Sequence, residues 1–126
     1  MGPDVLFFFE KAPEALPLYE TFEARTLADV ENVFIRVQKT QITFTNPRAF
    51  AAVSFLPVRR KLLRPERCIT VTLGLNRRLE SPRVDAVSEP YPARWTHHLM
   101  IASAGEIDEE LMGWVREAAA FSAAKR

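Results

Sequence analysis

The chain has 126 residues, of which 48% are hydrophobic and 26% are charged, and its formal net charge at pH 7 is +1. This composition is that of an ordinary globular protein and excludes a disordered or fibrous chain. The length predicts one domain spanning residues 1–126. The single cysteine, Cys68, excludes an internal disulfide, and no apolar run is long enough to span a membrane. We therefore expect a soluble cytoplasmic protein with no membrane partner.

Basic charge is concentrated in the middle of the chain. Residues 1–31 carry seven acidic and two basic side chains, whereas residues 59–102 carry nine basic and four acidic ones. Residues 32–58 add three bases and no acid, and the last 24 residues have a net charge of −2. Such a segment favours an anionic partner, although a solvated surface balanced by nearby acidic helices gives the same pattern.

The first 31 residues predict helices. Asp4 precedes the apolar run 5–9, which indicates a short capped helix, with a strand as the alternative. The segment 13–29 predicts a second helix that begins near Leu16, because Pro17 is tolerated only within a first turn. The apolar residues on one side of this helix are Leu18, Phe22 and Leu27.

Five segments predict strands, and the first, second and fourth of them place apolar side chains at every second position, the period of a strand. The five segments are residues 33–38, 41–45, 49–56, 68–75 and 95–102. Asn46-Pro47 is a turn signal, whereas Lys39-Thr40 is a poor two-residue hairpin turn, so that 33–45 is alternatively one continuous strand.

Two long connections, 57–67 and 76–94, hold most of the basic residues. Connections of this length tend to be functional or mobile. In a simple meander, 57–67 lies beside Lys39-Thr40 at one end of the sheet. The connection 76–94 then lies beside the turn 46–48 at the other end, which divides the basic charge into two patches.

The last segment predicts a helix that begins with a capping box of Ser103 and Glu106. The acidic residues that follow suit the positive end of the helix dipole. The residues at helical spacing that should face the sheet are Ile107, Leu111, Trp114, Val115, Ala118 and Phe121.

The only two histidines, His97 and His98, are adjacent on a predicted strand. Neighbouring strand residues point to opposite faces, so the two imidazoles do not converge on one metal ion. His97 goes with Leu99 and Ile101, and we expect it to be hydrogen-bonded at the margin of the core. His98 goes with Thr96 and Met100 and is the better functional candidate, because histidine exchanges protons near neutral pH.

The sequence has no Gly-rich phosphate loop, no nucleophile elbow and no His-Glu metal motif, so neither a cofactor nor a metal is expected. Arg67 could lower the pKa of Cys68, but a buried structural thiol is the stronger interpretation. Core packing is expected for Trp95 and Phe50. As the alternative, these two and Tyr91 offer stacking faces beside arginines.

These patterns predict an α+β fold, in which an antiparallel sheet of about five strands is packed by an N-terminal helix and a C-terminal helix. The preferred function is a non-enzymatic binding module for an anionic or nucleic-acid partner, in which the cations contact phosphate or carboxylate and a tryptophan stacks. The predicted ligand-binding residues are Lys39, Arg59, Arg60, Arg94, Trp95 and His98.

Two alternatives come from different classes of protein. The first is a small enzyme in which His98 is the general base and an arginine holds an anionic substrate. It requires His98 to line a concave pocket with a basic or polar companion within hydrogen-bond reach. The second is a homodimerising interaction domain that uses the alanine-rich side of the last helix, around Ala119, Ala120 and Ala124.

Three stretches carry a family resemblance: RVQKTQITFTN, FAAVSFLPVRR and RWTHHLMIASAGEIDEELMGWVREA. Together they resemble the bacterial domain-of-unknown-function 5655 family, from about Phe7 to Ala120. The resemblance implies a compact α+β bacterial domain. It implies no activity and no catalytic residue. A transport label sometimes attached to the family is at odds with the lack of an apolar membrane segment.

Overall fold

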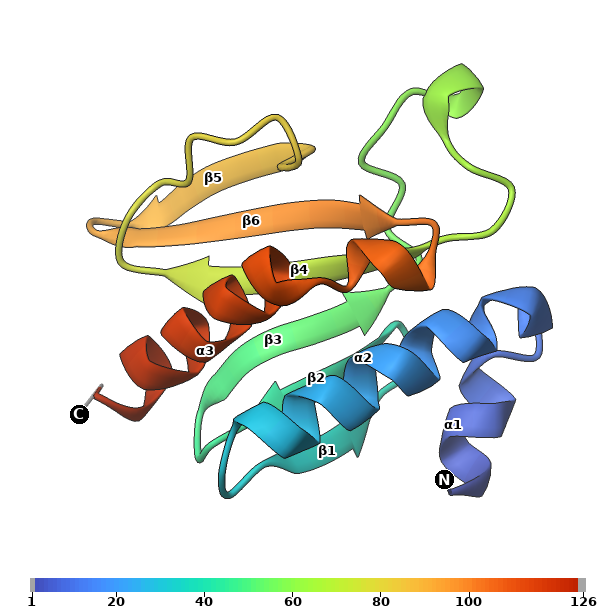
Figure 1. The fold of residues 1–126 in the computed structure, drawn as a ribbon, viewed down its shortest axis with the longest axis horizontal. Coiled ribbons are helices and arrows are strands. Elements are labelled where there is room, and N and C mark those ends of the chain that lie inside the picture. The colour runs from blue at the N-terminus through green and yellow to red at the C-terminus, as the bar shows by residue number, and fades with distance from the viewer. Residues whose placement is uncertain (1, 125–126) are drawn as a thin grey trace.

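The computed structural model describes residues 2–124 as an antiparallel sheet with two long helices on one face (Figure 1). The helices are α1 (Pro3–Phe8), α2 (Leu16–Asp29) and α3 (Glu109–Ala123). The strands are β1 (Phe34–Val37), β2 (Gln41–Thr45), β3 (Ala49–Ser54), β4 (Ile69–Leu75), β5 (Ala86–Tyr91) and β6 (Arg94–Ile101). Short 3-10 turns occupy Pro13–Ala15, Lys61–Leu63 and Ala104–Glu106. The α+β prediction is confirmed, including the start of α2 at Leu16.

The sheet has six strands in the order β1-β2-β3-β4-β6-β5, one more than the sequence predicts. The additional strand, β5, is an edge strand inside the long connection 76–94. Its residues are mostly exposed, so its sequence AVSEPY shows no buried alternation. Residues 33–45 form two strands, because the Gln38 N–H donates to the Gln41 carbonyl at 2.8 Å and closes a hairpin.

The two long connections lie differently from each other. Gln41 pairs with Ser54, so residues 55–68 lie beside Lys39-Thr40, as the meander predicts. The first and last residues of 76–94 lie at the end of the sheet that holds the turn 46–48, as the meander predicts, but the residues between them do not. Residues 76–85 cross the helix-covered side of β6 and return as the edge strand, with the Asp85 N–H donating to the His98 carbonyl at 2.8 Å.

Strand register separates the two faces of the sheet. Phe44, Ala51, Leu73 and His97 form one row across four strands, and all four are buried on the side covered by α2 and α3. The row beside it holds Thr43, Ala52, Thr72 and His98, and it belongs to the opposite face, which no long helix covers (Figure 1).

The two long helices bury the expected sides with some exceptions. In α2, Leu18 and Phe22 are buried, but Leu27 is 46% exposed, and Thr26 is buried one position earlier. The buried stripe of α3 consists of Leu111, Met112, Val115, Ala118, Ala119 and Ser122. Trp114 and Phe121, which were expected in that stripe, are only half-buried.

The start of α3 differs from the prediction. The Glu106 carboxylate accepts the backbone N–H groups of Ala102 and Ser103 at 2.7 and 3.0 Å, but it closes a 3-10 turn rather than the helix. The helix begins later, at Glu109, and its N-cap is Asp108, which accepts the Leu111 N–H at 3.0 Å. Both caps satisfy amides that have no partner within the helix.

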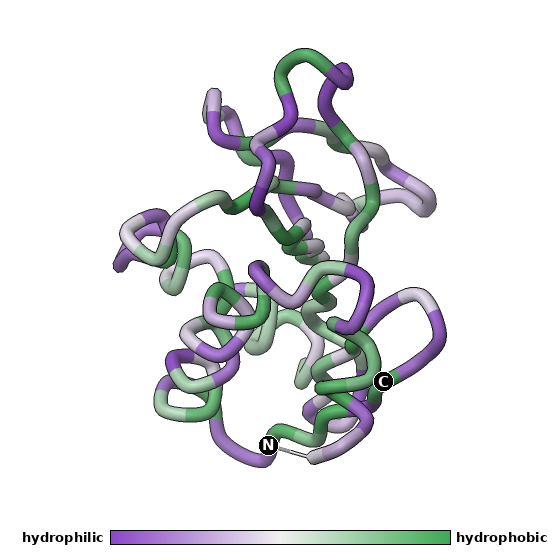
Figure 2. The backbone as a smooth tube through the Cα atoms, turned by 90° about the vertical axis from the view of Figure 1, so that its right-hand side faces the viewer, coloured by the Kyte–Doolittle hydropathy of each residue, from purple (hydrophilic) through white to green (hydrophobic). Residues whose placement is uncertain are grey.

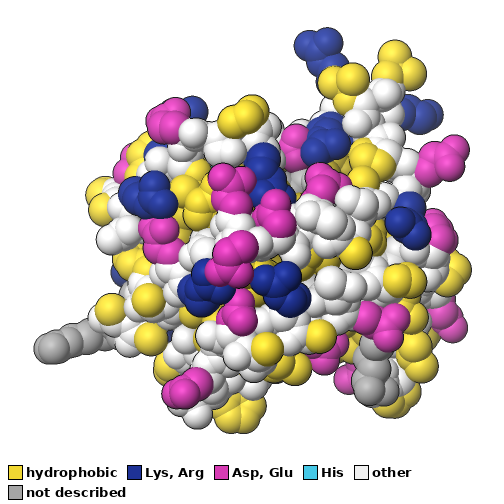
Figure 3. Space-filling model, in the orientation of Figure 1, with side chains coloured by type: hydrophobic (Ala, Val, Ile, Leu, Met, Phe, Trp, Pro, Cys, Tyr) yellow, Lys and Arg dark blue, Asp and Glu magenta, His cyan; other side chains and the backbone are white. Residues whose placement is uncertain are grey.

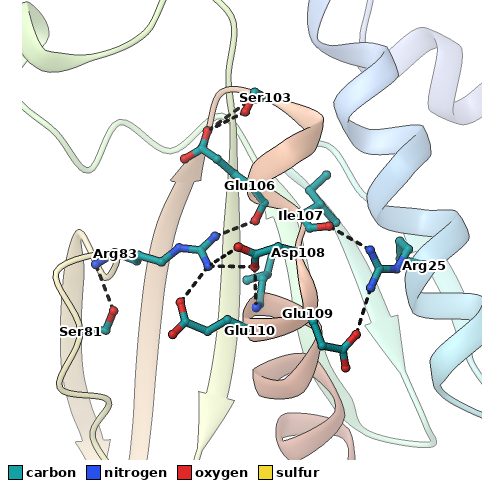
Figure 4. Close-up of polar contacts among 10 residues, drawn as sticks. Arg25, Ser81, Arg83, Ser103, Glu106, Ile107, Asp108, Glu109 and Glu110 are labelled. Carbon is teal, nitrogen blue, oxygen red and sulfur yellow. Dashed lines mark hydrogen bonds and ion pairs between the residues drawn. The ribbon is translucent and has the colours of Figure 1, made fainter.

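Arg83 joins the connection 76–85 to this helix start (Figure 4). Its guanidinium donates to the Glu106 carbonyl at 2.6 Å and to the carboxylates of Asp108 and Glu110, both at 2.9 Å. The side chain is only 24% exposed and stacks over Trp114 at 5.7 Å. This arginine therefore fixes the crossing segment against the helical layer.

We expect Arg83→Ala to lower the free energy of unfolding by about 1–2 kcal/mol, because it removes charge-assisted hydrogen bonds from a half-buried position. Denaturant unfolding measures the change. Arg78→Ala is the matched control, since Arg78 is 54% exposed and its pair with Glu80 spans 4.0 Å. Equal losses in both variants would show that Arg83 is not a special anchor.

His97 is an integral part of the core. It has no exposed surface, and its Nε2 accepts the Leu79 N–H at 3.0 Å, so that nitrogen carries no proton. Burial lowers the pKa of the His97 imidazole, and it also lowers that of His98. The sequence prediction of a hydrogen-bonded histidine is confirmed, with the residue in the core rather than at its margin.

This burial predicts a loss of stability in mild acid. The unfolded chain protonates His97 near its ordinary pKa of about 6.5, before the folded chain does, so stability is full above that pH and falls below it. We expect the melting temperature to drop between about pH 7.5 and about pH 5.5. His97→Gln, whose amide oxygen can still accept the Leu79 N–H, should flatten this drop. An unchanged pH slope in that variant would contradict the assignment.

Candidate functional site

The six predicted ligand-binding residues do not form one site. Lys39, Arg59 and Arg60 lie at the end of the sheet where Gln41 pairs with Ser54. His98 lies midway along β6 on the face away from the long helices, opposite Thr72. The remaining two, Arg94 and Trp95, begin β6 at the other end of the sheet.

The aromatic residues near Arg94 do not provide a stacking face beside Lys39, Arg59 and Arg60, which lie at the opposite end of the sheet. Trp95 pairs with Leu75 and shares its side of β6 with His97, away from His98. Its ring is half-buried beneath Arg78, at 5.8 Å. Arg94 instead lies over Tyr91 at 5.9 Å. Phe50, the third aromatic candidate, is in the core as expected.

Arg59 has a structural role. Its Nε donates to the Asp85 carboxylate at 2.7 Å, and its Nη2 donates to the Met100 carbonyl at 3.2 Å. Asp85 also accepts the Met100 N–H at 2.7 Å and is only 13% exposed. These contacts tie residues 55–68 to β6, so Arg59 anchors the loop to the sheet.

Four arginines outside residues 55–68 form ion pairs with carboxylates of the long helices. Arg77 Nε lies 2.7 Å from a Glu117 oxygen in α3, and Arg83 pairs with Asp108 and Glu110. Arg25 and Arg116 pair with Glu109, and Arg116 also pairs with Asp29. Acidic residues at the start of α3 and along it therefore neutralise Arg77 and Arg83, two of the nine basic residues that the sequence concentrates in 59–102.

Residues 55–68, called the basic loop below, are different. Four cations in it form no ion pair with any residue that the structure describes: Arg60, Lys61, Arg64 and Arg67. Between them the 3-10 turn carries Leu62, which is 98% exposed, and Leu63, which is 66% exposed. The loop thus combines unpaired positive charge with exposed apolar side chains.

The basic loop projects from the body of the domain (Figures 1 and 3). Figure 2 shows its hydrophobic tip at the top of the molecule, flanked by hydrophilic segments. A pocket of about 330 Å³ lies at its base, lined by Lys61, Arg64, Cys68, Thr70 and Met100 together with Phe55, Pro57 and Pro65. Positive charge is therefore present both on the loop and at its base.

A neighbouring pocket of about 330 Å³ contains His98. The His98 Nδ1 lies 2.8 Å from the Thr72 Oγ1 of β4, within hydrogen-bond distance. Burial lowers the pKa of the His98 imidazole, which is therefore neutral at pH 7. The complete lining is Lys11, Thr40, Gln41, Ser54, Phe55, Leu56, Thr72 and His98.

Two other side chains of this pocket, Gln41 and Lys11, make local contacts. Gln41 Nε2 donates to Thr43 Oγ1 at 2.8 Å, and the Thr43 hydroxyl donates to Gln38 Oε1 at 2.6 Å. The Lys11 ammonium lies 5.2 Å from the centre of the Phe55 ring. Sequence analysis missed Lys11 and Thr72. Strand alternation places Thr72 on a face, but only the pairing of β4 with β6 places it beside His98.

Cys68 and the dimerisation candidates have other placements. Burial raises the pKa of the Cys68 thiol despite Arg59 and Arg64 nearby, which fits a structural thiol. Ala119 is buried in the core of its own chain, so the small-residue side of α3 is partly occupied, while Ala120 and Ala124 are exposed.

Metal-ligand clusters and membrane-spanning helices are both absent from residues 2–124. No group of three or more His, Cys, Asp or Glu side chains in this range is arranged to hold a metal ion. None of the helices in that span has the length and apolar character needed to cross a bilayer.

Comparison with known proteins identifies a family. No curated protein and no solved structure matched the chain. The family model described as Domain of unknown function (DUF5655) matches residues 7–122, which is nearly the whole chain and confirms the resemblance seen in the sequence. The chain therefore belongs to the DUF5655 family.

Proposed function

We propose that this domain is a non-enzymatic binding module whose basic loop binds an anionic partner. The observation that carries the proposal is the division of the positive charge. Arg77 and Arg83 are used in ion pairs with α3, whereas the four cations of the basic loop have no carboxylate partner among the described residues. Clustered unpaired cations attract anions by long-range electrostatics.

The same geometry argues against base stacking as the source of affinity. Trp95 and Tyr91 lie at the far end of β6, away from the basic loop. An anionic ligand would therefore be held through its charged groups rather than through aromatic platforms. We also infer a cytoplasmic location, which is supported by the single, half-buried cysteine.

The test is fluorescence anisotropy of the whole chain with labelled single- and double-stranded oligonucleotides as polyanion probes. We expect binding that weakens about 40-fold between about 50 and about 200 mM salt, for about three phosphate contacts on a duplex. Arg60→Glu with Lys61→Glu should abolish most of this binding. Arg59 is left unchanged because it anchors the loop through Asp85.

The matched control has the same charge change at the other end of the sheet. Arg48→Glu with Arg94→Glu reverses two exposed cations, one in the β2–β3 turn and one at the start of β6. It should leave most of the affinity intact. Equal losses in both double variants, or affinity that does not respond to salt, would contradict a local electrostatic site.

A second function is favoured by the His98 pocket. His98 meets the geometric condition for a general base, since it lines a concave pocket and has Thr72 at 2.8 Å. Its neutral imidazole can accept a proton at pH 7, and the ammonium of Lys11 in the same pocket can hold a carboxylate or phosphate. We therefore propose, as the alternative, a small enzyme acting on an anionic substrate.

A panel of nitrophenyl esters and phosphate esters that carry a negative charge tests this alternative. Turnover should fall about 10²-fold or more in His98→Asn, which retains the shape but not the basicity of the side chain. Lys11→Met should raise KM more than it lowers kcat, because Lys11 binds rather than reacts. Turnover no faster than in buffer across the panel would exclude the enzyme hypothesis for these ester classes.

A further inference from the structure

The tip of the basic loop carries large apolar side chains that nothing in the described chain covers. Leu62 is 98% exposed and Leu63 is 66% exposed, and Leu56 at the loop base is 46% exposed. Scattered apolar residues are normal on a protein surface, but adjacent leucines at a projecting tip form an apolar patch. Such a patch gains free energy when it enters an apolar medium.

The base of the loop holds this tip in place. At the base of the loop, the Thr70 Oγ1 of β4 donates to the Leu56 carbonyl at 2.7 Å. The contacts of Arg59 with Asp85 and with the Met100 carbonyl fix the chain just before the tip. A tip presented from an anchored base loses less conformational freedom when it binds.

Positive charge surrounds the two leucines on both sides in the sequence. Arg60 and Lys61 precede them, and Arg64 follows directly. The only acidic residue of the loop is Glu66. Long basic side chains extend their charged ends away from an apolar contact. The leucines can therefore contact an apolar region while the cations contact polar groups beside it.

We infer that the basic loop docks on an anionic lipid surface, inserting Leu62 and Leu63 while its cations contact the phosphate headgroups. This inference rests on the proposed function and names its partner. A lipid surface uses both properties of the tip, whereas a soluble polyanion uses only the charge. A projecting tip also suits a flat surface, which it reaches without obstruction from the rest of the domain (Figure 3).

The expectation of no membrane partner rested on the lack of an apolar run long enough to span a bilayer. Peripheral docking needs no spanning helix, and it agrees with the helices of the described chain being unable to cross a bilayer. A cytoplasmic domain would meet the inner leaflet, whose anionic lipids attract basic segments at about 1 kcal/mol per Lys or Arg.

Co-sedimentation of the whole chain with vesicles tests the inference. Vesicles of phosphatidylcholine with about one-quarter phosphatidylglycerol should bind the protein, and vesicles of phosphatidylcholine alone should not. Leu62→Ser with Leu63→Ser should weaken binding to the anionic vesicles about tenfold or more, from the apolar surface no longer buried. Both side chains are exposed, so the folded state should be unaffected.

The matched control is Phe34→Ser. Phe34 is 71% exposed and begins β1 at the end of the sheet opposite the basic loop. This variant removes an exposed apolar side chain elsewhere and should bind anionic vesicles as the unmodified protein does. Anionic-vesicle binding that is equally strong in the leucine double variant would overturn the insertion of the tip.

The vesicle and oligonucleotide measurements separate the two proposals. Salt-sensitive oligonucleotide binding without binding to anionic vesicles would overturn the lipid inference and leave the anion-binding function in place. Failure to bind either probe would overturn both proposals. Vesicle binding that is lost in Arg60→Glu with Lys61→Glu, and weakened in the leucine double variant, would support both.

Discussion

The placement of the basic loop depends on the carboxylate of Asp85. This carboxylate accepts hydrogen bonds from Arg59 in the loop and from the Met100 N–H of β6, both at 2.7 Å. The backbone N–H of Asp85 donates to the His98 carbonyl. One residue thus joins the basic loop, β6 and the start of the edge strand β5. Because Asp85 is largely buried, these charge-assisted bonds are little weakened by solvent. The projecting tip is held to the sheet through this connection.

Ion pairing divides the basic residues into two groups with different uses. Those that reach α2 and α3 meet the carboxylates at the helix surfaces, as Arg83 does at the start of α3, and contribute to the fold. In the basic loop only Arg59 is paired, with Asp85. The other four cations of the loop have no ion-pair partner among the described residues. The small net charge of the chain conceals this division, since the same total results from neutralised and from exposed cations.

The adjacent histidines show how the alternation of a strand gives two identical residues different chemistry. His97 is enclosed in the core with its Nε2 committed to the Leu79 N–H. His98, one residue later, faces a pocket with Thr72 and Lys11. Burial lowers the pKa of both imidazoles, but only His98 has access to a ligand. The two pockets beside the basic loop share Phe55, so a ligand in one lies close to the other.

The sequence by itself determined the fold class, the start of α2, the strands β1–β4 and β6 and the opposite placement of His97 and His98, because these follow from local sequence patterns and from the restrictions of proline. It did not show β5, whose exposed edge position removes the buried alternation. It also did not distinguish Arg59 from Arg60, since consecutive arginines differ only in what the fold brings near them. The tertiary structure alone decided which cations are paired, which leucines are exposed, and that Thr72 and Lys11 join His98, because these contacts link residues far apart in the chain.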